Sequence, residues 1–191
     1  MTDAARCAIV AARLAREGVA GRTIRLRLAT PDDADFIFAL RKDEDRTRHL
    51  SAIGDDVESQ RRYLAGYQAR ERAGAELYFI ICDAAGDAVG TLRIYDYRGN
   101  SFSWGSWLIR PGTPPAVAME SALCVYELAF GPLGFERCHF EVRKGNERVI
   151  AFHTRFGAVQ SGEDELAWQF TFSKADYAAS RARYAKYLPT T

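Results

Sequence analysis

The chain has 191 residues, and its 26 lysines and arginines balance 25 aspartates and glutamates to a formal net charge of +1. This balance excludes a protein held on nucleic acid by a basic surface, and an aromatic content of 12% excludes a disordered chain. No apolar run approaches the about 20 residues that cross a bilayer. We therefore expect one globular domain with neither a nucleic-acid nor a membrane partner.

The cysteines give no sign of a metal site or a redox motif. None is spaced as CxxC, and a free thiol among apolar neighbours behaves as a small core residue. Arginines interrupt the first 20 residues, so the continuous apolar region of a secretory signal is absent. We expect a cytoplasmic protein with structural thiols. The cysteines are Cys7, Cys82, Cys124 and Cys138.

Hydrophobic periodicity and turn residues divide the chain into helices and strands. Alternating apolar residues predict a half-buried strand at 23–29, and the continuous apolar run 77–82 is typical of a strand buried on both faces. Apolar residues three or four positions apart, as from Met119 to Phe130, predict a helix. The predicted elements are, in chain order, a helix over 3–17, a strand over 23–29, two helices between 30 and 74, strands over 77–82, 88–95 and 102–109, a helix over 114–130, a strand over 137–143, a helix over 146–156, a strand over 166–172 and a C-terminal helix from 173.

No repeat, linker or low-complexity segment divides the chain after its first helix. We expect an N-terminal helical extension over residues 1–22, either docked or mobile, and a single domain over residues 23–191. The predicted fold is α+β, with a mixed and mostly antiparallel sheet of about six or seven strands flanked by helices.

This order of elements resembles the GNAT superfamily of acyl-CoA N-acetyltransferases over about residues 23–172. Residues 40–43, Leu-Arg-Lys-Asp, are similar to a Leu-Arg-Asn-Asp segment common in aminosugar acetyltransferases. Residues 107–111 resemble the strand end before the family's pyrophosphate loop, and residues 126–137 resemble its join between helix and strand. Residues 146–158 match the closing Asn-x-x-Ala-x-x-Leu-Tyr-x-Lys-x-Gly-Phe pattern.

The resemblance implies that acetyl-CoA lies in a cleft between the strands 102–109 and 137–143, with its pyrophosphate at the start of the helix 114–130. The family's glycine-rich loop falls on residues 114–119, which read Pro-Pro-Ala-Val-Ala-Met here, and proline has no N–H to offer a phosphate. We expect Thr113 to cap the helix and the following amides to compensate; a proline-built helix start without a ligand is the alternative. The candidate cofactor-binding residues are Leu108, Ile109, Arg110, Thr113, Ala116, Val117, Ala118 and Asn146.

Three residues are candidates for proton transfer. His153 stands where the family often has a tyrosine that returns a proton to the CoA thiolate, and an imidazole with a pKa near ~6.5 can do so at neutral pH. A partly buried helix residue is the alternative for it. No general base is evident, because Ser103 stands about where many relatives carry a glutamate. His49 and Asp96 are the candidate bases, with a solvated surface role and a turn-stabilising role as their alternatives.

The predicted reaction is direct acetyl transfer from acetyl-CoA to a primary amine, with no metal. The segment 40–43 favours an amino group on a nucleotide-linked sugar, and aromatic side chains around strand 102–109 suit stacking on a sugar or base unless they belong to the core. The alternative acceptors are a protein N-terminus, a polyamine or another small amine. The alternative to an enzyme is a CoA-binding module without turnover. The expected partner is a small-molecule amine, and a homodimer stays open.

Overall fold

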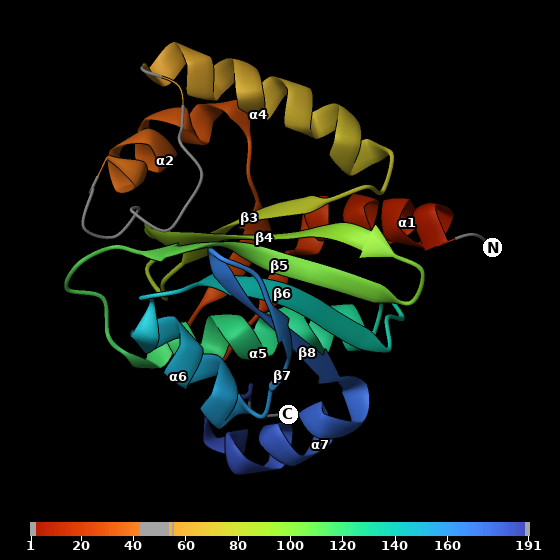
Figure 1. Cartoon of the computed structure of the whole chain (residues 1–191). Coiled ribbons are helices and arrows are strands. Elements are labelled where there is room, and N and C mark those ends of the chain that lie inside the picture. The colour runs from red at the N-terminus through yellow and green to blue at the C-terminus, as the bar shows by residue number, and fades with distance from the viewer. Residues whose placement is uncertain (1–2, 43–53, 55, 190–191) are drawn as a thin grey trace.

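The computed structural model describes residues 3–42, 54 and 56–189 (Figure 1). Its helices are α1 (Asp3–Glu17), α2 (Ala34–Arg41), α4 (Val57–Arg72), α5 (Ala116–Phe130), α6 (Glu147–Phe156) and α7 (Lys174–Arg183), with short 3₁₀ turns at η1 (Pro31–Asp33) and η2 (Ala185–Tyr187). Its strands are β1 (Val19–Ala20), β2 (Arg25–Leu28), β3 (Leu77–Cys82), β4 (Ala88–Arg98), β5 (Ser101–Ile109), β6 (Arg137–Arg143), β7 (Val159–Glu163) and β8 (Ala167–Ser173).

The strands form a single sheet in the order β1-β2-β3-β4-β5-β6-β8-β7. Every neighbouring pair is antiparallel except β5 and β6, which run parallel, so the predicted mixed and mostly antiparallel sheet is confirmed. The described residues contain eight strands, more than the expected six or seven. The additional strands are β1, which has two residues, and β7, an edge strand whose sequence Val-Gln-Ser-Gly-Glu has no apolar alternation.

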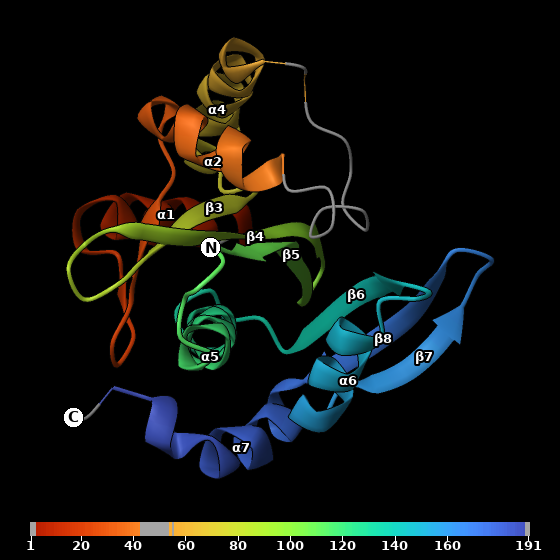
Figure 2. The ribbon, with the colours of Figure 1, turned by 90° about the vertical axis from the view of Figure 1, so that its left-hand side faces the viewer.

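Helices cover both faces of the sheet (Figures 1 and 2). Alternate residues of β3 separate two apolar clusters, and all six of its side chains are buried, as the continuous apolar run predicts. Tyr78, Ile80 and Cys82 pack with α2 and α4, whereas Leu77, Phe79 and Ile81 join the larger core around α5. The face that carries α2 and α4 is called the α4 face below, and the opposite one the α5 face.

The N-terminal helix α1 is docked on the domain. It packs against β2 and α4, and its apolar side joins the larger core through Cys7, Val10, Ala11 and Leu14. Gly74, with φ +69°, follows α4 at the point of contact, where an added Cβ would collide with the backbone of α1. All four cysteines are buried thiols outside any disulfide, as expected for core residues.

Several helix ends are fixed by local chemistry. Gly18 and Gly157 end α1 and α6 with φ of +62° and +107°, values that glycine adopts without strain. Asp56 caps α4 by accepting from the Ser59 amide at 2.6 Å, and Ser173 forms a capping box with Asp176 at the start of α7.

Candidate active site

The parallel strands β5 and β6 pair over only two residues. Ser101 lies opposite Arg137 and Phe102 opposite Cys138; beyond this point β6 continues along β8 while β5 stays with β4 (Figure 2). The two strands therefore diverge toward their C-terminal ends, at the position where the sequence predicts the cofactor cleft. Leu108 and Ile109 lie at the open end of β5, pairing with Thr91 and Gly90 of β4 on one edge while the other edge faces the diverging strand.

A bulge distorts β5 within this divergent region. Arg93 lies opposite Gly105 and Thr91 opposite Leu108, so two residues of β5, Ser106 and Trp107, face a single residue of β4. Ser106 has φ +50°, and its carbonyl accepts a hydrogen bond from Thr91 Oγ1 at 2.9 Å. Such a bulge bends a strand and redirects its side chains, and bulges are common beside active sites.

The start of α5 differs from the predicted cap. The helix begins at Ala116 without a side-chain cap, so the expectation that Thr113 caps it is wrong. The reason is local: Pro115, the second residue after Thr113, has no N–H to donate to the threonine hydroxyl, and the helix begins only at Ala116. The Val117 amide donates to the Pro114 carbonyl at 3.0 Å. Within the described residues, no backbone carbonyl outside the helix takes the amides of Ala116 and Ala118, which stay available to an anion.

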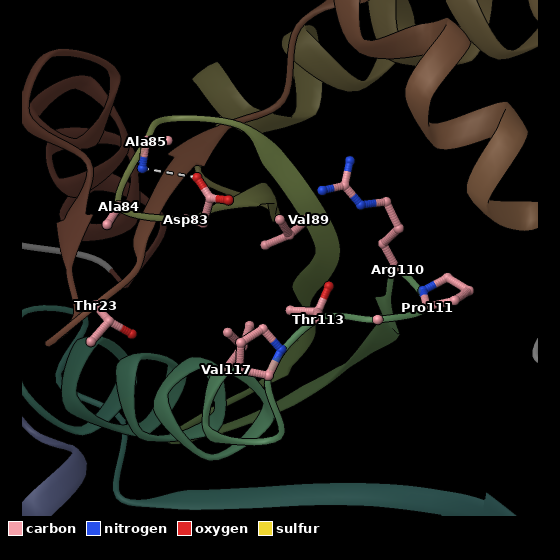
Figure 3. A pocket seen from close by; sticks show the side chains of 11 residues that line it. Thr23, Asp83, Ala84, Ala85, Val89, Arg110, Pro111, Thr113 and Val117 are labelled. Carbon is pink, nitrogen blue, oxygen red and sulfur yellow. Dashed lines mark hydrogen bonds between the residues drawn. The ribbon is translucent and has the colours of Figure 1, made fainter.

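A hollow of about 470 Å³ borders the same loop (Figure 3). Arg110, Thr113 and Val117 line one side of it, and the turn between β3 and β4 lines the other. The carboxylate of Asp83 in that turn is engaged by the amides of Ala85 and Asp87, each at 3.0 Å. No residue of β6 or α6 lines the hollow, so it lies on the β3–β4 side of the loop and not between β5 and β6.

His153 of α6 lies between the diverging strands. Its ring centroid is 5.5 Å from that of Trp104 on β5 and 4.3 Å from that of Phe140 on β6, and 5% of the residue is exposed. Burial lowers the pKa of His153 to about 3, and its Nδ1 is buried without a hydrogen-bond partner. The imidazole is therefore neutral at pH 7. The expected donation of a proton to the CoA thiolate would require His153 as an imidazolium, and the buried ring is not in that form at pH 7.

Asp96 lies at a second bulge, at the far end of β4. Its φ is +50°, and its carboxylate bonds Arg98 at 2.6 Å and His139 Nε2 at 3.2 Å. The hydrogen bonds from Arg98 and His139 lower the pKa of Asp96, so its carboxylate is a weak proton acceptor. The other ring nitrogen of His139, Nδ1, lies 2.7 Å from Ser101 Oγ. The third candidate for proton transfer, His49, lies outside the described residues.

Sequence reasoning missed His139 and Ser101 as possible members of the site. His139 shares one face of β6 with the exposed Arg137, Glu141 and Arg143, which is typical of a solvated strand face. Its partner Asp96 is 43 positions away, and the bulge that directs Asp96 toward it leaves no recognisable pattern in the sequence.

A charged and aromatic cluster occupies the α4 face beside the β5 bulge. Glu76 is 6% exposed and accepts from Arg70 Nε at 2.6 Å and from Arg93. The Arg93 guanidinium lies 5.1 to 5.9 Å from three tyrosine ring centroids. We call these residues the Arg93 cluster; its members are Arg70, Glu76, Arg93, Tyr63, Tyr78 and Tyr95.

The three aromatic side chains of β5 lie in the core or pack against it. Trp104 donates to Tyr126 Oη at 3.0 Å, Trp107 donates to Ser121 Oγ at 3.1 Å, and Phe102 is fully buried. The core alternative is therefore correct for these three residues.

The other predicted contacts lie where their elements begin or end. Asn146 precedes α6, where its carbonyl accepts from the amides of Val149 and Ile150 and its side chain forms no cap. Arg110 follows β5 and its side chain extends away from the start of α5 (Figure 3). In the described part of the chain, no three His, Cys, Asp or Glu side chains gather as a metal site. Nor is any described helix both long and apolar enough to cross a membrane.

Comparison with known proteins identifies the family. Residues 23–159 match the family model described as the acetyltransferase (GNAT) domain. The chain belongs to the GNAT family. As a GNAT protein it is an acyl-CoA-dependent N-acetyltransferase.

The solved structure of apo FdhC, described as a nucleotide-linked sugar GNAT, is 39% identical to this GNAT protein. The match has a TM-score of 0.83 and covers 90% of this chain and 98% of FdhC. The fold is shared with Mycobacterium smegmatis RimJ in complex with CoA-disulfide, at 18% identity, a TM-score of 0.74 and coverage of 90% and 96%. It is also shared with Vibrio cholerae spermidine N-acetyltransferase in complex with CoA and spermine, at 16% identity, a TM-score of 0.68 and coverage of 82% and 98%. A search of curated proteins finds no match.

Proposed function

We propose that the protein transfers the acetyl group of acetyl-CoA to the amino group of a nucleotide-linked amino sugar. The observation that carries this proposal is the 39% identity to a nucleotide-linked sugar GNAT over 98% of that relative. The segment from Leu40, whose resemblance to aminosugar acetyltransferases is independent of that comparison, supports the same acceptor class.

The charge of the Arg93 cluster favours an anionic acceptor over a polyamine. Arg70 and Arg93 flank a single buried carboxylate, Glu76, so the described cluster has an excess of positive charge. A nucleotide-linked sugar has a negatively charged diphosphate, whereas a polyamine has several ammonium groups that this excess would repel. The similarity to spermidine N-acetyltransferase, at 16% identity, extends to the fold alone.

The residues present fit acetyl-CoA as the second substrate. The amides of Ala116 and Ala118 are suited to a pyrophosphate, and the edge of β5 that faces the diverging β6 is suited to the amide groups of a pantetheine arm. His153 Nδ1 is buried and without a partner between the strands, so it would offer a bound thioester a hydrogen-bonding atom of a neutral imidazole. When bound, acetyl-CoA supplies the acyl group; the protein orients it and excludes water.

A thiol-release assay across acceptor classes tests the proposal. Nucleotide-linked amino sugars, spermidine and a peptide with a free N-terminus are each supplied with acetyl-CoA, and products are identified by mass. We expect N-acetylated sugar nucleotide, with kcat/KM at least about 100-fold above that for spermidine or peptide, equivalent to about 2.7 kcal/mol of transition-state discrimination. A higher kcat/KM for spermidine or peptide would overturn the proposal.

A further inference from the structure

Ser101, His139 and Asp96 form a continuous hydrogen-bonded chain across three strands. Ser101 Oγ lies 2.7 Å from His139 Nδ1, and His139 Nε2 lies 3.2 Å from Asp96 Oδ2. An ionised carboxylate only accepts hydrogen bonds, so Nε2 carries the proton of the neutral ring and donates it to Asp96. Nδ1 is then the acceptor, and the Ser101 hydroxyl donates to it. Ser101 therefore donates to His139 and His139 donates to Asp96, which is the direction needed to move a proton from Ser101 to His139.

The chain stands at the narrow end of the divergence between β5 and β6. Ser101 is in one of the only two residue pairs that join these strands, and His139 immediately follows Cys138 of the other pair. The strands join here and diverge toward their C-terminal ends, so an acyl group carried between them would meet this end of the cleft. On β5, Ser101 and Ser103 share one side of the strand, which also carries Gly105 opposite Arg93 of the Arg93 cluster.

The backbone is bent to make this contact. Asp96 has φ +50° at a bulge where β4 and β5 lose register between Tyr95 and Arg98. The left-handed conformation is uncommon for a residue other than glycine, although aspartate is among the side chains that tolerate it. Arg98 holds the carboxylate from the solvent side at 2.6 Å, and 21% of the His139 side chain is exposed. The pair can therefore exchange a proton with solvent after each turnover.

We propose that Ser101, His139 and Asp96 form the proton relay that deprotonates the substrate ammonium before acyl transfer. The ammonium N–H gives its proton to Ser101 Oγ while the Ser101 hydroxyl proton passes to His139 Nδ1, and Asp96 stabilises the resulting imidazolium. The neutral amine then attacks the thioester carbonyl and the C–S bond breaks. The nitrogen of the adduct loses one proton to solvent, the departing thiolate takes up one proton from solvent, and the His139 imidazolium releases the relayed proton to solvent. Ser101 contacts the amine, and His139 and Asp96 act through it as positioning residues.

This inference rests on the proposed function for its natural acceptor, but two small amines test it independently. Methylamine is almost wholly an ammonium ion at pH 7.5, whereas hydroxylamine is already neutral. A relay is needed for the first and dispensable for the second. A hydrogen-bonded tie that merely holds β6 to the hairpin would affect both acceptors alike.

The experiment measures kcat for both amines at saturating acetyl-CoA in the wild type and in Ser101→Ala, His139→Gln and Asp96→Asn. We expect His139→Gln and Ser101→Ala to lose about 100-fold with methylamine, the usual size of a general-base contribution, and less than about 3-fold with hydroxylamine. Imidazole added to a His139→Ala variant should restore part of the methylamine rate. The matched control is Glu136→Gln, which removes an exposed ion pair with Lys174 beside the start of β6 and should leave both rates unchanged.

Two results would overturn the relay. One is a methylamine rate in Ser101→Ala and His139→Gln within 3-fold of the wild type. The other is an equal loss with both amines in variants whose thermal unfolding is unchanged. Either result leaves the identity of the natural acceptor to the separate assay with sugar nucleotides.

Discussion

His153 is a buried histidine, and its environment distinguishes a charged proton donor from a neutral hydrogen-bonding side chain. Its pKa of about 3, against 6.5 for an exposed imidazole, results from desolvation alone. An imidazolium cannot persist there at neutral pH, whereas a neutral ring still offers a hydrogen-bonding atom. His153 therefore lies between β5 and β6 as a neutral side chain, and its part in the reaction stays a prediction.

The same desolvation predicts how stability depends on pH. The folded state binds no proton at His153 until about pH 3, whereas the unfolded state binds one below about pH 6.5, so acid favours unfolding in this window. As the pH falls from 7 to 5, His153 alone should lower the free energy of unfolding by about 2 kcal/mol. His153→Phe should abolish that component and leave the variant more stable at pH 5 relative to the wild type, measured by urea unfolding at both pH values. Identical pH dependence in the two proteins would show that His153 titrates normally.

The acid–base residues show the limit of reading single positions. Asp96 was predictable as a candidate because it stands beside aromatic residues at a hairpin end, and the structure places it against His139, next to the residue pairs that join β5 and β6. Its partner His139 was not, because the hydrogen bond depends on a bulge and on the parallel pairing of β5 with β6, neither of which has a local signature. Contacts between residues about 40 positions apart follow from the fold as a whole.

At the scale of elements, α4 is fastened to the sheet by the buried carboxylate of Glu76. Arg70 comes from α4 and Arg93 from β4, so Glu76 joins helix and sheet through both guanidinium groups. Removing its charge leaves Arg93, which is largely buried, without its ion-pair partner.

We expect Glu76→Gln to lower the unfolding free energy by about 1–3 kcal/mol, because each arginine is partly exposed and solvent recovers part of the loss. Urea unfolding at pH 7 measures it. The matched control is Glu58→Gln, which removes an exposed pair with Arg61 on the same helix and should cost no more than about 0.5 kcal/mol. Equal effects of the two substitutions would contradict the role given to Glu76.

A single substitution at the start of α5 should stabilise the fold and weaken ligand binding. Ala116→Asp places a negative charge beside the unbonded amides of the first turn, where the helix dipole stabilises it by about 0.3–1 kcal/mol. The same charge would repel a pyrophosphate, so the dissociation constant for CoA should rise at least about 10-fold. Calorimetric titration and urea unfolding measure the two effects. Unchanged CoA affinity would remove this helix start from the cofactor site.

Most elements were predictable because their patterns are local. The strand predicted at 77–82, the helix predicted to end at 156 and the helix predicted from 173 each follow from neighbouring residues alone: an apolar run, Gly157 and the Ser173 cap. The exceptions depend on tertiary pairing: β7 is a polar edge strand that β8 recruits, and two successive prolines shift the start of α5 past its expected threonine cap.

For the whole molecule, a net charge of +1 leaves no general field that would attract a polyanionic ligand. Binding then has to come from local groups, and we propose the α5 amides for a cofactor and the Arg93 cluster for an acceptor. A ligand held by the folded state stabilises it by mass action, about 2.7 kcal/mol at 100 times its dissociation constant. CoA at that concentration should raise the unfolding free energy by this amount, and an absence of any shift would contradict a cofactor site.

The central claim is that a nucleotide-linked amino sugar is the acceptor, and a matched pair of substrates tests it most directly. The measurement is kcat/KM, by thiol release with acetyl-CoA, for one nucleotide-linked amino sugar and for the same amino sugar without its nucleotide. The nucleotide should raise kcat/KM at least about 100-fold, and Arg93→Gln should reduce that advantage. Equal kcat/KM for the two sugars, or faster acetylation of spermidine than of either, would contradict the claim.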